Sequence, residues 1–117
     1  MSKLTPFGRF IRKYRIDHDI LLKHMADKLG LSSAFLSAIE NGAKSIPFDF
    51  EDKLIKIYPF TIDEINQLKE SIDLSRSEVN IQVHTPLEQQ LAGAFCRNFN
   101  SLDDELKKEI LKLLKGD

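Results

Sequence analysis

Two short helical patterns, separated by a glycine, occupy residues 22–42, and this stretch constrains the fold most strongly. Gly30 suits a left-handed helix end, and Ser32 can cap a second helix that runs into the turn signal Asn41-Gly42. The apolar positions at helical spacing are Met25, Ala26 and Leu29 in the first pattern and Phe35, Leu36 and Ile39 in the second. Two short helices joined by a glycine turn are typical of a helix-turn-helix, but also of an ordinary helical hairpin, so both interpretations stay open here.

The composition limits the class of protein. A chain of 117 residues suits one domain with an appendage, and a single Cys excludes an internal disulfide, so we expect a reducing cytoplasm. We expect neither a membrane span nor a signal peptide, because no apolar run is long enough and no basic-then-apolar start is present. The patterns indicate a soluble helical protein.

The charge is distributed unevenly along the chain. Residues 1–58 contain ten Lys and Arg against seven Asp and Glu, a net charge of +3, whereas residues 59–117 contain seven against eleven, a net charge of −4. A basic amino-terminal half is typical of a surface that faces phosphate, although a solvated helix face would look the same. Arg9 and Arg12 fall off the apolar face of their helix, and we expect them to contact phosphate without sequence preference.

Three further helices flank the pattern in residues 22–42. Thr5 and Pro6 form a start signal for the first helix, and Pro47 is expected to open another that Pro59 ends. Thr61 then caps a fifth helix with Glu64 at the capping-box position. The expected buried faces comprise Phe7, Phe10, Ile11 and Tyr14, then Phe50, Leu54, Ile55 and Tyr58, and lastly Ile62, Ile65, Leu68 and Ile72.

The run MADKLGLSSAFLSAIENG, which begins at Met25, resembles the Xre/Cro/phage-repressor family of helix-turn-helix regulators. The matching features are Ala26, Gly30, Leu31 and the run from Ser37 to Gly42, and the resemblance covers roughly residues 7–74. It implies an all-α protein in which residues 1–74 form a five-helix, lambda-repressor-like DNA-binding domain.

The resemblance also implies roles for individual residues. Arg15 would pair with Glu40, Asn41 and Lys44 would meet phosphate, and Leu21 and Leu22 depart from the polar residues that usually cap the second helix. Phe35 could project as an apolar wedge, but we expect it to pack in the core. The implied DNA-facing positions on the second helix of the pattern are Ser32, Ser33, Ala34, Phe35, Ser37 and Ala38. Bidentate base readout needs Arg, Gln, Asn or Lys, so these positions predict modest specificity, specificity from DNA shape and dimer spacing, or lost DNA binding.

Residues 75–117 form a different segment, which we interpret as a linker, a strand or extended arm, and two amphipathic helices. Residues 78–84 alternate polar and apolar side chains as a strand does, and such a strand needs a partner from another chain unless the segment is an arm lying across the helices. Pro86 opens one helix, and Ser101 is expected to cap the last. The residues expected to meet a second subunit or another partner are Val79, Ile81, Val83, Leu91, Phe95, Leu106 and Ile110.

No group of residues predicts enzyme chemistry, a metal site or a cofactor. His18, His24 and His84 lack ligand spacing, and Cys96 is expected to be a buried, inert thiol. We therefore expect a regulator of bacterial or phage transcription that binds operator DNA as a homodimeric repressor. The alternative is an antitoxin that regulates its own promoter and binds a toxin through residues 75–117. A third interpretation is an interaction module without DNA binding.

Overall fold

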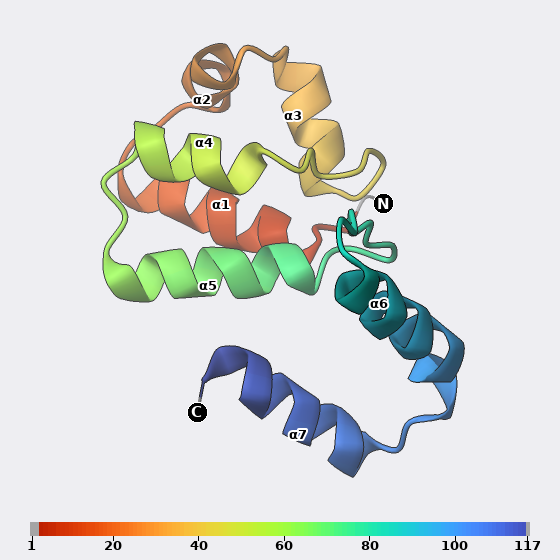
Figure 1. Cartoon of the computed structure of the whole chain (residues 1–117). Helices are drawn as coiled ribbons and strands as arrows, with labels where there is room; N and C mark the ends of the chain where they lie inside the picture. Colours follow the sequence, from red (N-terminus) through yellow and green to blue (C-terminus); the bar gives the residue numbers. More distant parts are fainter. Residues whose placement is uncertain (1–2, 117) are drawn as a thin grey trace. The chain divides into compact units, whose positions relative to one another are not determined.

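The computed structural model describes residues 3–116, and these residues form helices and connecting segments with no strand among them. The chain divides into two compact units, Met1–Val79, called the head below, and Asn80–Asp117, called the tail. The head contains α1 (Pro6–Asp17), α2 (Leu22–Leu29), α3 (Ser33–Glu40), α4 (Phe50–Ile57) and α5 (Ile62–Asp73). The tail contains α6 (Pro86–Asn98), a short 3₁₀ turn, η1 (Phe99–Ser101), and α7 (Asp104–Lys115) (Figure 1).

The helix boundaries in the head follow local capping chemistry. The Thr5 hydroxyl accepts the Gly8 N–H at 3.0 Å, with Pro6 at the first helical position of α1. Thr61 and Glu64 form the predicted capping box at the start of α5. Asp19, after α1, has a φ of 55°, a left-handed conformation that Asp tolerates better than most residues. These starts and stops were predictable because each depends on side chains within four residues.

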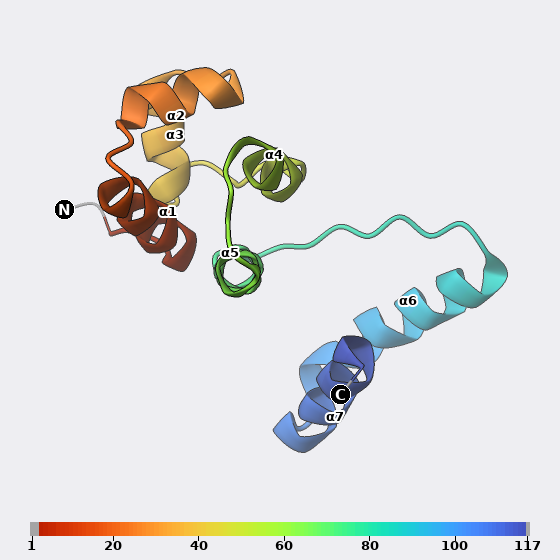
Figure 2. The ribbon, with the colours of Figure 1, turned by 90° about the vertical axis from the view of Figure 1, so that its left-hand side faces the viewer.

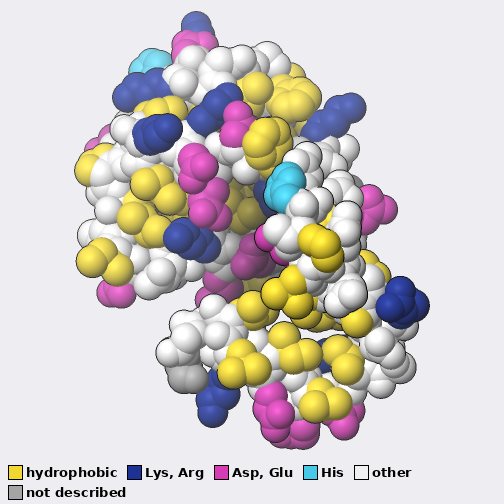
Figure 3. Space-filling view, viewed as in Figure 1, with side chains coloured by type: hydrophobic (Ala, Val, Ile, Leu, Met, Phe, Trp, Pro, Cys, Tyr) yellow, Lys and Arg dark blue, Asp and Glu magenta, His cyan; other side chains and the backbone are white. Residues whose placement is uncertain are grey.

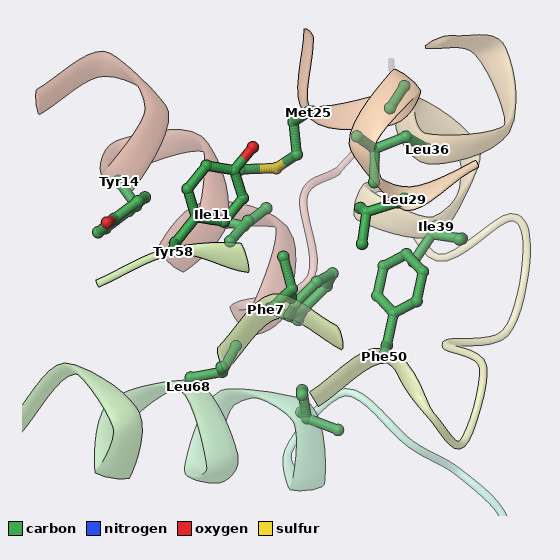
Figure 4. Packing of buried hydrophobic residues seen from close by; sticks show 13 residues of the cluster. Phe7, Ile11, Tyr14, Met25, Leu29, Leu36, Ile39, Phe50, Tyr58 and Leu68 are labelled. Atoms are coloured by element: carbon green, nitrogen blue, oxygen red, sulfur yellow. The ribbon is translucent and has the colours of Figure 1, made fainter. Parts of the chain in front are cut away.

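The five helices of the head enclose one hydrophobic core. α1 packs against α3 and α5, α2 packs against α3 and α4, and α4 packs against α5. Figure 4 shows side chains from all five helices converging, with the rings of Phe7 and Phe50 meeting edge to face at 6.0 Å. The buried hydrophobic residues are Phe7, Ile11, Tyr14, Met25, Ala26, Leu29, Leu36, Ile39, Phe50, Leu54, Tyr58, Leu68 and Ile72.

An aromatic cluster closes the core near the end of α1. Tyr14 lies 4.4 Å from Phe60 and 5.8 Å from Tyr58, measured between ring centroids. Burial raises the pKa of Tyr14 above its ordinary value of 10.0, and the Glu64 carboxylate raises it further. Burial likewise raises the pKa of Tyr58, with a further rise from Tyr14 and an opposing effect of Arg15. The fold therefore favours both hydroxyls in their protonated form.

Two expected boundaries are wrong. α4 begins at Phe50, not at Pro47, because Pro47 opens a turn in which its carbonyl accepts the Phe50 N–H at 3.1 Å. The last helix is capped by Asp103, whose carboxylate accepts the Leu106 N–H at 2.8 Å, whereas the expected cap, Ser101, ends η1. In both cases a turn separates the start signal from the helix.

The expected strand over residues 78–84 is not formed. Figure 2 shows this segment as a plain coil between α5 and α6. Val79 and Ile81 are exposed and Val83 is half-buried. A strand needs a neighbouring backbone to hydrogen-bond, and residues 3–116 supply none here, so the alternating pattern gives an extended arm in the single chain.

The tail differs from the head in having no buried side chain in α6, η1 or α7. Cys96, expected to be buried, is exposed, because α6 has no core to face. Of the expected partner-contacting residues in the tail helices, Leu91, Phe95 and Leu106 are exposed and Ile110 is half-buried. None of the helices in residues 3–116 has the length and apolar character needed to cross a bilayer.

Candidate nucleic-acid interface

The turn between α2 and α3 has the geometry that the sequence predicted. Gly30 ends α2 with a φ of 73°, and its N–H donates to the carbonyls of Ala26 and Asp27. The Leu31 N–H then donates to Ala26 O at 2.9 Å, and the Ser32 hydroxyl accepts the Phe35 N–H at 3.1 Å to start α3. At the other end, α2 begins at Leu22, and the residue at its N-cap, Leu21, makes no side-chain cap because its side chain is apolar.

α3 buries one side and exposes the other. Leu36, Ile39 and Glu40 are buried against the head. On the other side Ala34 is exposed, and Ser33, Ser37 and Ala38 are half-buried. This outer side is therefore small, neutral and shallow, with hydroxyl and methyl groups at its surface.

Phe35 departs from expectation. Its side chain is 39% exposed and is absent from the core cluster, so the expected core position is wrong and the ring lies at the start of the outer side of α3. The core position next to it is filled by Leu36, which is fully buried. At this exposure, Phe35 is the largest side chain that α3 offers to a partner.

The loop after α3 is held in place by hydrogen bonds. Asn41 Oδ1 accepts the Ala43 N–H at 3.0 Å, which leaves the amide nitrogen as a donor for another partner. Gly42 has a φ of 83°, and its N–H donates to Ile39 O, while the Lys44 N–H donates to Ala38 O at 3.1 Å. The exposed ammonium of Lys44 therefore starts from an ordered backbone.

An ion pair joins α1 to the end of α3. Arg15 Nη1 and Nη2 donate to Glu40 Oε2 and Oε1 at 2.5 and 3.2 Å, a bidentate arrangement in which both side chains are almost fully buried. Arg15 Nη1 also lies 3.7 Å from Met25 Sδ on α2. The structure thus brings together the two residues that the resemblance pairs, and it places them where three helices meet.

The backbone carbonyl of Glu40 also accepts two hydrogen bonds. The Thr5 N–H and Thr5 hydroxyl both donate to Glu40 O at 3.0 Å. A Cβ atom at Gly8 would lie 2.1 Å from the same carbonyl oxygen, so only glycine lets α1 approach so closely. Sequence reasoning missed both contacts, although a glycine inside an apolar helix pattern was the available signal.

The segment that contains α3 carries a single carboxylate. Glu40 is the only acidic residue between Lys28 and Phe48, and Arg15 neutralises it. Arg9 and Arg12 are exposed on α1, which has no acidic residue before Asp17. Figure 3 shows Lys and Arg side chains spread over the visible face of the head, with Asp and Glu side chains among them. The exposed Lys and Arg side chains are the groups that would attract a polyanion.

No group of three or more His, Cys, Asp or Glu side chains in residues 3–116 is arranged to hold a metal ion. Comparisons with protein-family models, with curated proteins and with solved structures found no match.

Proposed function

We propose that the head is a helix-turn-helix domain of the Xre/Cro type that binds double-stranded DNA with α3 in the major groove, and that the chain acts as a dimeric transcriptional repressor in the cytoplasm. The observation that carries the proposal is the geometry of α2, its glycine turn and α3, with Gly30 left-handed, Ser32 capping α3, and one side of α3 buried while Ala34 and Phe35 on the other side are exposed. An eight-residue helix is about 12 Å long, which matches the width of the major groove.

The phosphate contacts would come from residues on α1 and in the loop after α3. Arg9, Arg12 and Lys44 would neutralise phosphates, and the Asn41 amide nitrogen would donate to a phosphate oxygen. Each neutralised phosphate contributes about −0.9 to the slope of log K against log salt concentration. Three cations therefore give a slope of about −2.7 for one head and about −5.4 for two heads.

The base contacts would be few. Ser33 and Ser37 can each make single hydrogen bonds, and Ala34, Ala38 and Phe35 can contact thymine methyl groups. We therefore expect selected sites to show thymine at a few fixed positions, in two half-sites about 34 Å apart on one face of the duplex.

The first experiment is selection of bound sequences from a random DNA pool with the full chain. Enrichment of a two-fold symmetric sequence would support the proposal. Recovery of no sequence, together with no salt-dependent binding to any duplex, would overturn it in favour of an interaction module that does not bind DNA.

Lys44→Ala tests the phosphate contacts directly. We expect weaker binding to every sequence and a salt slope lower by about one for each head. The matched control is Lys69→Ala, because Lys69 is an exposed lysine on α5, a helix that packs on α1 and α4. A loss confined to one sequence, with the slope unchanged, would contradict the assignment of Lys44 to phosphate.

An antitoxin is the second candidate function, and the exposed apolar side chains of α6 and α7 favour it. In that case the head would bind its own promoter and the tail would bind a toxin. Coexpression with the product of an adjacent gene, followed by purification of a stable complex, would support this candidate.

A further inference from the structure

The outer side of α3 divides into an apolar part and an edge that carries hydroxyl groups. Because an α-helix has about 3.6 residues per turn, Ala34 and Ala38 lie on one line along the middle of this side, opposite the buried residues. Phe35, whose side chain is 39% exposed, lies at one edge of that line. Ser33 and Ser37 lie at the other edge. Two methyl groups and a ring therefore form the apolar part, and two hydroxyls form the polar edge.

The major groove presents only one kind of apolar group to such a surface. The base edges there carry hydrogen-bond donors and acceptors, and the apolar group among them is the methyl group at C5 of thymine. 5-Methylcytosine carries the same methyl group at the same place in the groove, because methylation at C5 leaves the pairing with guanine unchanged. The apolar part of α3 can contact this methyl group on either base, whereas cytosine and uracil offer it no apolar contact.

The hydroxyl edge of α3 cannot distinguish the two methylated bases. Thymine presents an acceptor, O4, beside its methyl group, and 5-methylcytosine presents a donor, the N4 amino group. A serine hydroxyl both donates and accepts, so Ser33 and Ser37 suit either base. The side chains that select adenine or guanine on the opposite strand are Asn, Gln, Arg and Lys, and α3, with the sequence SAFLSAIE, contains none of them. The methyl group is therefore the feature of the base pair to which α3 responds.

We propose that the head recognises C5-methyl groups in the major groove through Ala34, Phe35 and Ala38, so that methylation of cytosine at C5 strengthens its binding to duplex DNA. The inference rests on the proposed function, because it needs α3 in the major groove, and it adds a ligand, 5-methylcytosine, and a form of regulation. Thymine and 5-methylcytosine become equivalent for this surface. C5 methylation of a duplex would then create a binding site without a change of sequence.

Four duplexes of about 30 base pairs, or three helical turns, test the proposal without a known operator. The first two alternate adenine with either thymine or uracil, and the other two alternate guanine with either 5-methylcytosine or cytosine. Within each pair of duplexes the phosphates and the hydrogen-bonding groups are the same, and only the methyl group differs. Because the methyl group recurs at every second base, the head meets it in any register along the duplex.

We expect the full chain, followed by fluorescence anisotropy, to bind each methylated duplex at least about fourfold more tightly than its unmethylated counterpart. Burying one methyl group changes a binding constant by about fourfold, a smaller effect than a bidentate base contact gives. Raising the salt concentration from about 50 to 200 mM should weaken binding to all four duplexes and leave each ratio unchanged, because salt screens phosphate contacts and not apolar ones.

Two variants separate a direct contact from an effect of the methyl group on DNA shape. Phe35→Ala removes the exposed ring, and Ala34→Gln places an amide over the apolar part at an exposed position outside the core. Each should lower the ratio between methylated and unmethylated duplexes to below about twofold. The matched control is Phe48→Ala, because Phe48 is a 91% exposed ring outside α3, and this variant should keep the ratio of the parent. Far-UV circular dichroism verifies that each variant keeps its helices.

Equal binding within each pair of duplexes, with salt-dependent binding to all four, would overturn the inference and leave the proposed function standing. A ratio that persists in both Phe35→Ala and Ala34→Gln would also overturn it, since the methyl group would then act through the shape of the duplex. A preference for thymine over uracil, without one for 5-methylcytosine over cytosine, would overturn the equivalence of the two bases. No binding to any duplex at about 100 μM chain and about 50 mM salt would remove the proposed function together with the inference.

Discussion

The ion pair between Arg15 and Glu40 gives the sharpest test of how the head holds α3. Both groups are buried, and the pair is bidentate. Glu40→Ala removes the carboxylate and leaves the Arg15 guanidinium without a charged partner in the interior. Breaking a buried pair from one side destabilises a protein by about 3–5 kcal/mol, because the remaining charge is no longer compensated.

That cost is large for a unit of this size. Small domains unfold with about 5–15 kcal/mol, and 1 kcal/mol corresponds to about 4–8 °C in the melting temperature of a domain of 60–100 residues. A loss of about 3 kcal/mol should therefore lower the melting temperature by about 12–24 °C. Arg15→Met combined with Glu40→Leu removes both charges and fills the space, so this double variant should lose much less than Glu40→Ala alone.

The assay is urea unfolding of the parent, the two single variants Arg15→Met and Glu40→Leu, and their combination, followed by circular dichroism at 222 nm. The double-mutant cycle gives the coupling between the two side chains, which we expect to be about 2–3 kcal/mol. A coupling below about 0.5 kcal/mol, with the two single losses simply adding, would refute the argument that the pair fixes α1 against α3.

Three more changes test other contacts of the head. Gly8→Ala should destabilise by about 1–3 kcal/mol in thermal unfolding, although alanine favours helices, because its Cβ would meet Glu40 O at 2.1 Å; an equal or higher melting temperature would contradict this close approach. The pKa values of Tyr14 and Tyr58 are raised, so the folded head binds more protons than the unfolded chain above about pH 10. The free energy of unfolding should fall as the pH rises from there, and Tyr58→Phe should reduce the fall. A chain that lacks all residues from Ser75 onward should melt lower than one ending at residue 79; identical unfolding curves would contradict a structural role for the Ser75 hydroxyl.

Local chemistry explains why the helices of the head could be predicted from the sequence. Thr5, Ser32 and Thr61 each accept a backbone N–H three residues later, so the cap and its target lie within one turn. Gly30 marks a left-handed residue that few other side chains allow. The buried faces of α1, α2 and α4 follow from spacing, since a residue and its neighbours at three and four positions share one side, but Ile62, expected on the buried face of α5, is 79% exposed.

Contacts between distant residues explain what the sequence did not reveal. The Ser75 hydroxyl accepts the Phe7 N–H at 2.9 Å and donates to Ser71 O at 2.6 Å. Ser75 was expected to lie in a linker, and these hydrogen bonds connect it to the start of α1 and to α5. The expected domain end at residue 74 therefore precedes residues that belong to the compact head, which continues to Val79. No local pattern signals a hydroxyl that bonds across 68 positions. The predicted burial of Phe35 and Cys96 was wrong for a related reason, because an apolar residue on a helix is buried only where another element covers it.

The small side chains on the outer side of α3 place a further demand on any DNA-binding function. A good bidentate base contact contributes about 1–3 kcal/mol of discrimination, and Ser33, Ala34, Ser37 and Ala38 cannot make one. Discrimination would then have to come from holding two heads at a fixed separation, because joining two weak binders can raise affinity by about 10²–10⁴ only when both reach their half-sites together. Under this reasoning a chain that ends at Val79, where the compact head ends, should bind a selected operator about 10²-fold or more weakly than the full chain. Binding to a single half-site should be the same for both proteins, since both contain every residue of the head, and equal affinity for the whole operator would contradict the reasoning.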